Sequence, residues 1–318
     1  MRVAGIDCGT NSIRLLIAEA SQGADGVQLA DVERRMQIVR LGQGVDATGR
    51  FAPEALERTY AAVRDYAALI ERHQVAHTRF VATSATRDVA NREEFLDTIE
   101  QILSVRPEVI SGQEEAALSF AGATGVLPAD AAGERMVIDL GGGSTEFVIG
   151  AGRTPRTAVS LDMGCVRVTE RFFSDGLGGL DARSQAADFI DDQLRVLESL
   201  DLSQLTGLVG VAGTITTLTA QALGLEHYDS QRIHGAQLDF CQMRQATGAI
   251  LGMNRAQRAA LGFMHPGRVD VIQAGALIVE RVLSHVHRAT SGRVERITAS
   301  EHDILDGIAA SVAALHTA

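Results

Sequence analysis

Hydrophobic positions along the chain follow two spacings, one typical of strands and the other of helices. Short apolar runs rich in β-branched residues predict strands at 2–7, 13–20, 28–36, 78–83, 108–111, 134–139, 145–150, 157–161, 207–211 and 293–299. Apolar positions with helical spacing predict helices near 54–72, 91–103, 114–122, 181–200, 239–251, 269–288 and 303–316. Because the two kinds of element are interspersed, we expect an α/β fold with mixed sheets.

One strand–turn–strand pattern occurs twice. Residues 7–12 and 139–144 both read Asp-x-Gly-x-x-Ser, each between two apolar runs and with identical offsets. Turn residues between β-branched runs are typical of β-hairpins. A single copy would be weak evidence, but two copies in register predict a duplicated domain. The best linker, 123–130, precedes the second copy.

Composition narrows the class of protein. A chain of 318 residues favours two domains, and 46% hydrophobic with 22% charged residues is typical of a globular protein. No apolar run approaches the roughly 18 residues of a membrane span. Asp7 lies too near the N-terminus for a signal peptide, and three widely spaced cysteines form neither a disulfide framework nor a zinc pattern. We therefore expect a cytoplasmic protein.

The charge pattern limits the chemistry. A net charge of −11 argues against nucleic acid as a partner across the whole surface, although a local basic groove remains compatible with it. All 29 basic residues are arginine, which excludes Schiff-base lysines and the Walker A loop. Any bound anion must therefore be held by arginine side chains or backbone amides.

An Asp-x-Gly-x-x-Ser turn offers several groups to a phosphate. Its glycines let the backbone approach an anion and direct N–H groups toward it. The aspartate can hold Mg²⁺ directly or through water, and the serine hydroxyl can donate to a phosphate oxygen. Two such turns facing each other across a cleft would hold a phosphate chain from both sides. The alternative, which a lone copy would favour, is an ordinary tight turn with a capping aspartate.

Both turns resemble the paired phosphate loops of the exopolyphosphatase/guanosine pentaphosphate phosphatase (Ppx/GppA) family, in its short two-domain form. The resemblance continues through 81–87, 109–116, 163–167 and 210–216, and these blocks run in family order along nearly the whole chain. It implies two duplicated actin/hexokinase-like (ribonuclease H-like) domains with mixed sheets around an interdomain cleft. The implied domains are 1–125 plus 300–318, and 126–299.

The resemblance also assigns roles to residues. Glu115 is the implied catalytic base, although Glu114 and Glu115 could instead cap a helix. Asp139 and Glu146 would place Mg²⁺ beside the phosphates. The implied phosphate ligands are Asp7, Gly9, Thr10, Asn11, Ser12, Arg14, Arg87, Gly141, Gly142, Gly143, Ser144, Thr145, Gly213, Thr214 and Arg268.

Some of these assignments have structural alternatives. On local evidence, Gly213 and Thr214 fit an ordinary strand-to-helix turn equally well. Each arginine could form a surface ion pair, and we rank Arg14 and Arg87 above Arg268 as phosphate ligands.

The closing segment departs from the family pattern. The family element Ser-(x)n-Leu-Arg-Glu-Gly has Leu305 here in place of arginine and Asp306 in place of glutamate. We therefore expect one phosphate contact to be missing, or to be supplied by Glu301, His302 or Asp306.

The resemblance implies Mg²⁺-dependent hydrolysis of the terminal phosphoanhydride of inorganic polyphosphate, releasing orthophosphate. Longer family members continue into helical C-terminal domains, so we expect this short form to prefer short chains. The nearest alternative substrate is guanosine pentaphosphate (pppGpp). A kinase of the same superfamily and a non-catalytic (p)ppGpp-binding regulator are further alternatives. We expect no nucleic-acid or membrane partner and leave a homodimer open.

Overall fold

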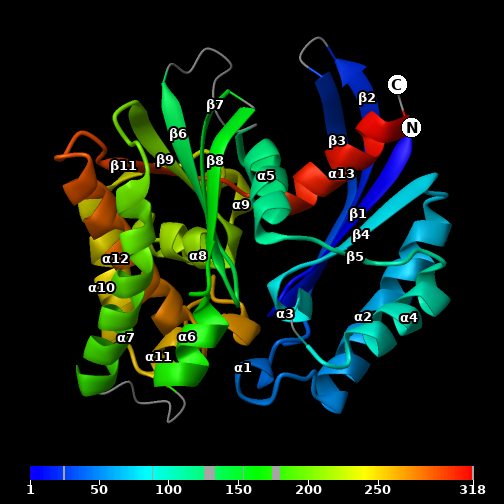
Figure 1. Ribbon diagram of the computed structural model, residues 1–318, viewed down its shortest axis with the longest axis horizontal. Coiled ribbons are helices and arrows are strands. Elements are labelled where there is room, and N and C mark those ends of the chain that lie inside the picture. Colours follow the sequence, from blue (N-terminus) through cyan, green and yellow to red (C-terminus); the bar gives the residue numbers. More distant parts are fainter. Residues whose placement is uncertain (24–25, 88, 125–132, 153, 174–179, 317–318) are drawn as a thin grey trace. The chain divides into compact units, whose positions relative to one another are not determined.

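The computed structural model describes residues 1–23, 26–87, 89–124, 133–152, 154–173 and 180–316. The chain divides into two compact units (Figure 1). Unit 1 comprises Met1–Gly122 and Asp303–Ala318, and unit 2 comprises Ala123–His302. Each unit contains one mixed sheet with helices, so the predicted fold class is confirmed. Most of the linker predicted at 123–130 lies outside the described residues.

The sheet of unit 1 has the strand order β3-β2-β1-β4-β5. Its strands are β1 (Arg2–Cys8), β2 (Ser12–Gly23), β3 (Gly26–Ile38), β4 (His77–Ala82) and β5 (Glu108–Val109). The central strand β1 pairs antiparallel with β2, forming the first predicted hairpin, and parallel with β4. Since residues of a strand point alternately to its two faces, β1 contributes to a core on each side of the sheet.

Helices cover both faces of this sheet. They are α1 (Val45–Thr48), α2 (Pro53–Arg72), α3 (Ser84–Arg87), α4 (Arg92–Leu103), α5 (Gly112–Ala123) and α13 (Ile304–His316). The helices α2 and α4 pack on one face around Tyr66, Phe80 and Phe95. The last helix, α13, packs on the other face against β1 and β2 (Figure 1). The one-turn helices α1 and α3 were not predicted, because so short a segment has no measurable periodicity.

Helices α5 and α13 are in backbone contact at two glycines. A Cβ atom on Gly122 would collide with the carbonyl of Asp303, and one on Gly307 would collide with the carbonyl of Leu118. The apolar side chains of Val81 and Ile308 are packed in the same region. The end of the chain therefore fixes the position of α5 on unit 1.

The sheet of unit 2 has the strand order β10-β11-β9-β6-β7-β8. Its strands are β6 (Glu134–Leu140), β7 (Thr145–Ala151), β8 (Thr154–Leu161), β9 (Leu205–Val211), β10 (Gln237–Asp239) and β11 (Arg296–Ala299). Strand β6 pairs antiparallel with β7 and parallel with β9. The same relation joins β1 to β2 and β4, so the duplication expected from the two turns extends to the sheet topology.

Helices of unit 2 pack around one large apolar core. They are α6 (Cys165–Phe172), α7 (Leu180–Leu194), α8 (Ala212–Ala222), α9 (Ser230–Ile233), α10 (Phe240–Gly252), α11 (Arg255–Ala259) and α12 (Ile272–Ala289), with the 3₁₀ helices η2 (Arg195–Ser199) and η3 (Pro266–Arg268). The helix predicted at 181–200 therefore ends in a 3₁₀ segment. Most of α12 is buried, which explains its nearly continuous apolar sequence.

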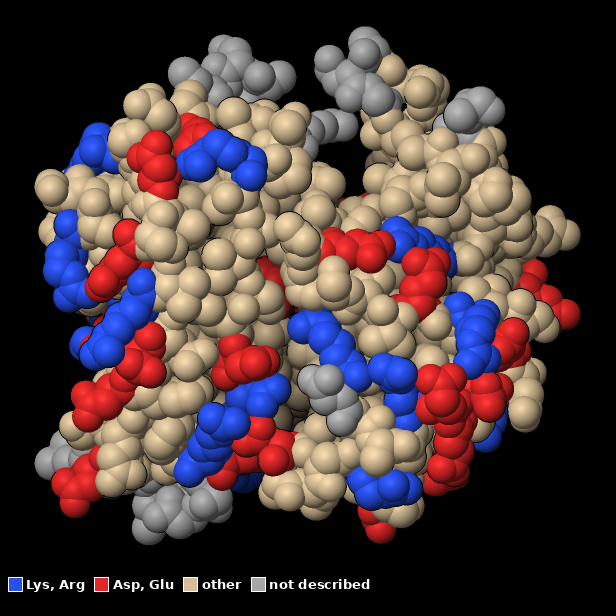
Figure 2. All heavy atoms as spheres, viewed as in Figure 1, with Lys and Arg blue, Asp and Glu red and all other residues tan. Residues whose placement is uncertain are grey.

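Charged side chains of both signs are interleaved on the surface. Figure 2 shows arginines beside acidic residues over much of the visible face. Arg106, for example, forms ion pairs with Glu93, Asp97 and Glu100. An arginine in such a pair has less charge to offer an external anion. None of the helices in the described parts of the chain has both the length and the apolar character needed to cross a membrane.

Candidate functional site

The first turn begins at Asp7, at the end of β1. The Arg14 guanidinium lies opposite on β2 and donates to Asp7 Oδ2 through Nε at 2.9 Å and Nη2 at 2.6 Å. The same guanidinium also binds the carboxylate of Asp303. Burial raises the pKa of the Asp7 carboxyl, because one guanidinium shared by two carboxylates only partly offsets desolvation. Arg14 is therefore already engaged by two acidic side chains.

The backbone of this turn is held by the segment that follows β3. The N–H of Gly42 donates to the carbonyl of Thr10 at 2.9 Å, and those of Val39 and Arg40 donate to the carbonyl of Asn11 at 3.1 and 2.9 Å. In a trans peptide the C=O and N–H groups point in opposite directions. The N–H groups of the same two peptide units therefore point away from residues 39–42.

The two neighbouring glutamates of α5 have different environments. Ser111 precedes this helix, and its hydroxyl accepts the N–H of Glu114 at 3.1 Å, which is an N-cap contact. The Glu114 side chain is exposed and pairs with Arg79 at 2.8 Å. Glu115 is only 8% exposed and pairs with Arg87. Glu115 is thus a buried carboxylate held in place by an arginine, which helix capping does not require.

Parallel strands bring the unit 1 residues together. Strands β1, β4 and β5 run parallel, and their carboxyl ends lead into the first turn, into α3 with Arg87, and into α5 with Glu115. The hydroxyls of Thr10 and Ser84 are 3.0 Å apart and link the first turn to α3. Carboxyl ends of parallel strands are the usual place for ligands in α/β sheets.

The second turn begins at Asp139, at the end of β6. Asp139 lies directly opposite Glu146 on β7, and both are buried. The Ser160 hydroxyl on β8 donates to Glu146 Oε1 at 2.7 Å. Directly opposed residues of an antiparallel pair share one face, with Cβ atoms about 4.5–5.5 Å apart. The hairpin therefore presents two adjacent carboxylates.

This carboxylate pair fits the oxygen preference of Mg²⁺. Mg²⁺ in proteins takes one or two carboxylates and completes its shell with water and substrate phosphate oxygens. Zinc would favour nitrogen or sulfur ligands, which Asp139 and Glu146 do not provide. Across the described residues, no group of three or more His, Cys, Asp or Glu side chains is arranged to hold a metal.

The glycines of the second turn contact the beginning of α6. The N–H groups of Gly164, Cys165 and Val166 donate to the carbonyls of residues 143, 141 and 142 at 3.1, 3.0 and 2.8 Å, respectively. All three glycine carbonyls therefore face α6. No hydrogen bond within the described part of the chain uses the N–H of Gly142 or Gly143.

A third turn lies beside the second. Strand β9 runs parallel to β6 and ends at Val211, opposite Asp139. The next residue, Ala212, has φ of +67°, a conformation that is uncommon outside glycine and clusters at functional sites. A Cβ on Gly213 would collide with the Arg268 guanidinium, so that side chain lies directly against the turn.

A buried thiol connects the second and third turns. The Cys165 thiol at the start of α6 interacts with the Thr214 hydroxyl and lies near Arg268. Burial raises the pKa of this thiol to about 11, so it is neutral at physiological pH. The structure thus brings the second turn, Gly213, Thr214 and Arg268 together within unit 2.

Acidic side chains of the closing segment accept hydrogen bonds from other side chains of the protein. Leu305, at the position of the family arginine, is 1% exposed and packs in the core with Val3 and Leu16. Asp306 accepts hydrogen bonds from Arg34 at 2.6 and 3.2 Å. Glu301 accepts the hydroxyl of Tyr228 at 2.6 Å. Position 305 therefore points into the apolar core, and Asp306 is neutralised by an arginine of β3.

Sequence reasoning missed several partners of these residues. Asp303 binds Arg14 across most of the chain length, Ser160 binds Glu146, and Ser84 contacts Thr10. None has a local signature, because its role depends on a partner that is distant in sequence. A family block at 163–167 was noted, but its contact with the second turn was not.

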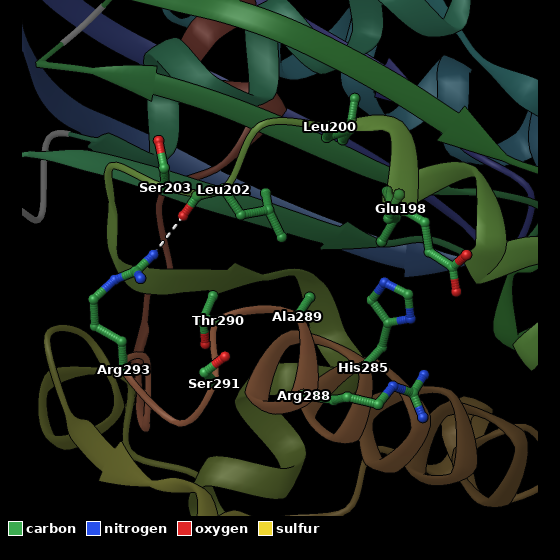
Figure 3. Close-up of a pocket in the computed structure, with 11 residues that line it drawn as sticks. Glu198, Leu200, Leu202, Ser203, His285, Arg288, Ala289, Thr290, Ser291 and Arg293 are labelled. Atoms are coloured by element: carbon green, nitrogen blue, oxygen red, sulfur yellow. Dashed lines mark hydrogen bonds between the residues drawn. The ribbon is translucent and has the colours of Figure 1, made fainter.

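A cavity of about 460 Å³ in unit 2 lies elsewhere (Figure 3). It is lined by residues before β9 and at the end of α12, whereas Gly213 follows the other end of β9. Its charged side chains have both signs and include Glu198, Arg288 and Arg293, the last donating to the carbonyl of Leu202 at 2.6 Å. None of the predicted site residues lines this cavity.

The chain matches one protein-family model and a named relative over most of its length. The model of the Ppx/GppA phosphatase family matches residues 16–311. Exopolyphosphatase 2 of Mycobacterium tuberculosis (strain CDC 1551 / Oshkosh) is 47% identical over 318 residues, covering 98% of each chain.

Solved structures of similar sequence support the same family. The crystal structure of an exopolyphosphatase-like protein has a TM-score of 0.92 at 45% identity, covering 98% of this chain and 97% of that one. The Aquifex aeolicus member of the Ppx/GppA family has a TM-score of 0.81 at 30% identity, with coverage of 100% and 99%. The resemblance inferred from the motifs is confirmed, and with it the actin/hexokinase-like fold class. The chain therefore belongs to the Ppx/GppA phosphatase family and is a phosphoanhydride hydrolase.

Proposed function

We propose that this enzyme removes the terminal phosphate of inorganic polyphosphate, with Glu115 as general base and Mg²⁺ bound by Asp139 and Glu146. The observation that carries the proposal is the environment of Glu115, which is buried, is held by an arginine and follows the carboxyl end of a parallel strand. The glycine turns of both units also follow the carboxyl ends of parallel strands. The name of the 47% identical relative, exopolyphosphatase 2, supports this substrate.

Phosphate binding rests on backbone amides and on one arginine. Arg14 and Arg87 already neutralise carboxylates, whereas the Arg268 guanidinium lies against Gly213 and, among the described residues, donates only a long hydrogen bond, of 3.4 Å, to Thr217. We therefore rank Arg268 first among the side-chain phosphate ligands, reversing the order expected from the sequence. Thr214 and the N–H groups of the glycine turn supply further donors.

The chemistry is attack by water on the terminal phosphorus. Glu115 accepts a proton from the water as the new O–P bond forms, while the bridging P–O bond breaks and the shortened chain leaves. Arg87 pairs with the carboxylate and orients it, and the ionised carboxylate is the form that accepts a proton. When bound, Mg²⁺ would neutralise phosphate charge and orient the chain for in-line attack.

The test replaces the base without changing its shape. Glu115→Gln should lower kcat by about 10²–10⁴-fold, the usual contribution of a general base, while leaving binding of Mg²⁺-polyphosphate within about twofold of wild type. Glu114→Gln is the matched control and should retain wild-type kcat, because that carboxylate forms a surface ion pair. A Glu115→Gln enzyme with near-normal turnover would refute the assignment.

A phosphate-release assay identifies the preferred substrate. Short and long polyphosphates, pppGpp and ATP are compared with Mg²⁺ or with EDTA. Faster release from short polyphosphate than from pppGpp or long chains, abolished by EDTA, is the expected result. A preference for pppGpp would move the proposal to the alternative substrate while keeping the same terminal chemistry.

A further inference from the structure

The orientation of the second turn depends on α6. Carbonyls of Gly141, Gly142 and Gly143 all accept N–H groups from the beginning of this helix. Since each peptide unit directs its N–H opposite to its C=O, the N–H groups of residues 142, 143 and 144 point away from α6. A set of successive N–H groups presented on one side is a favourable anion site.

The contact between helix and turn is close. A Cβ on Gly164 would collide with the backbone of Gly142, so a larger residue at position 164 would separate the helix from the turn. The positive end of α6 therefore faces glycine carbonyls and stabilises them. The helix organises the anion-binding amides and does not itself receive the anion.

One side chain of α6 reinforces this contact. The Nε of Arg167 donates to the carbonyl of Gly143 at 2.9 Å, and its backbone N–H donates to the carbonyl of Gly142 at 3.1 Å. The Gly143 carbonyl thus accepts two hydrogen bonds, one from Arg167 and one from the N–H of Gly164. That carbonyl belongs to the peptide unit whose N–H is that of Ser144.

We propose that Arg167 is a positioning residue for phosphate binding: by holding the Gly143 carbonyl, it directs the Ser144 N–H toward the bound phosphate. The inference rests on the proposed function of the second turn. Arg167 acts through the backbone and does not itself contact the phosphate. Its guanidinium also reduces the negative potential of the glycine carbonyls.

If Arg167 only stabilised the fold, its replacement would have a different effect. Besides the turn, the Arg167 guanidinium lies 3.5 Å from Asp162, whose side chain is 76% exposed. An ion pair of that kind contributes little to stability. If it were the main role of Arg167, replacing the arginine would leave ligand affinity unchanged.

The experiment compares Arg167→Met and Arg167→Lys with Arg171→Met. Arg171 is the matched control, because it is exposed on the same helix and its guanidinium lies over the Phe189 ring, 5.3 Å from the centroid. Three quantities are measured with Mg²⁺ present: KM and kcat for polyphosphate, the Kd of tripolyphosphate by calorimetry, and Tm.

Arg167→Met should raise both KM and Kd about tenfold, the size expected for one lost hydrogen bond to a charged group. We expect kcat within about threefold and Tm within about 4 °C of wild type, because the exposed ion pair with Asp162 contributes little to stability. Lysine restores the charge but not the planar Nε–H, so Arg167→Lys should remain at least about threefold weaker than wild type. Arg171→Met should match wild type.

Wild-type affinity in Arg167→Met would overturn the proposal, as would full recovery in Arg167→Lys, which would assign the effect to charge. If Arg167→Met does not fold, the KM and Kd of Arg167→Lys test the proposal instead. If wild type binds tripolyphosphate but does not hydrolyse polyphosphate, the proposed substrate fails while the Kd values still test Arg167. If wild type does not bind tripolyphosphate, both proposals fail.

Discussion

At the residue scale, arginine supplies every strongly basic side chain of this protein, and several of these arginines are paired with carboxylates. Arg14 joins Asp7 to Asp303, Arg34 binds Asp306, and Arg87 binds Glu115. A guanidinium in such a pair orients the carboxylate and has less charge to offer an incoming phosphate. Arg268 differs, because its neighbours are Gly213 and a threonine hydroxyl.

Arg268→Gln should therefore weaken polyphosphate binding more than it slows the chemical step. A charge-assisted contact to phosphate contributes about 1.5–3 kcal/mol, so KM should rise roughly 10- to 100-fold. Steady-state kinetics with Mg²⁺-polyphosphate measure this. Arg255→Gln is the control, since Arg255 is exposed and pairs with Asp270 at 2.7 Å. A KM within twofold of wild type in Arg268→Gln would exclude Arg268 as a main ligand.

At the element scale, the two glycine turns share a backbone orientation but are held by different segments. Residues 39–42 hold the carbonyls of the first turn, and the beginning of α6 holds those of the second. In both cases the carbonyls are engaged on one side, which leaves N–H groups directed to the other. Two unrelated supporting segments thus give equivalent turns.

Helix α5, which carries Glu115, depends on its contact with α13. Gly307→Ala should destabilise the protein by about 1–3 kcal/mol, because the new methyl group would overlap the Leu118 carbonyl and the helices must separate. Urea unfolding measures the change.

The control is Gly248→Ala in α10, where a Cβ would meet no atom within 4 Å. Because alanine favours helix over glycine, that variant should be more stable by up to about 1 kcal/mol. Equal stability of Gly307→Ala and wild type would show that the two helices do not need this close contact.

At the scale of the whole molecule, an acidic protein can still bind a polyanion. The net charge of −11 is spread over a surface where both signs are interleaved, whereas binding depends on the local field of a few oriented groups. Phosphate affinity should therefore follow the turns and Arg268 and depend little on the total charge.

Acid should destabilise unit 2 through His285. This side chain is 4% exposed, and its Nε2 has no hydrogen-bond partner among the described residues. Burial, and then Arg288, lower its pKa below 6.5, while Glu198 and Asp191 oppose the shift. The unfolded chain takes up this proton near pH 6.5, so the free energy of unfolding falls as pH drops from about 6.5 toward the lower folded pKa.

His285→Leu removes that proton uptake. The loss of unfolding free energy between pH 7.5 and 5.5 should be smaller than in wild type, because the unfolded chain no longer takes up a proton at this position. Urea unfolding at the two pH values measures the difference, and comparing each protein only with itself cancels the change in packing. An unchanged pH dependence would contradict the role of His285.

The sequence by itself determined the features that follow from local pattern. Two Asp-x-Gly-x-x-Ser hairpins, the long helices α2 and α12, and the family all rest on residues close together in the chain. Short elements such as α3, α6 and β10 were missed, because one or two turns of helix or three strand residues have no period to detect.

Only the tertiary structure decided which side chains share a partner. It placed Leu305 in the core, separated the environments of Glu114 and Glu115, engaged Arg14 and Arg87 with carboxylates, and set Arg268 against Gly213. These outcomes depend on hydrogen bonds and packing between residues far apart in sequence. Sequence spacing therefore predicted the chemical groups of the candidate site, whereas packing determined which of them are already paired within the protein.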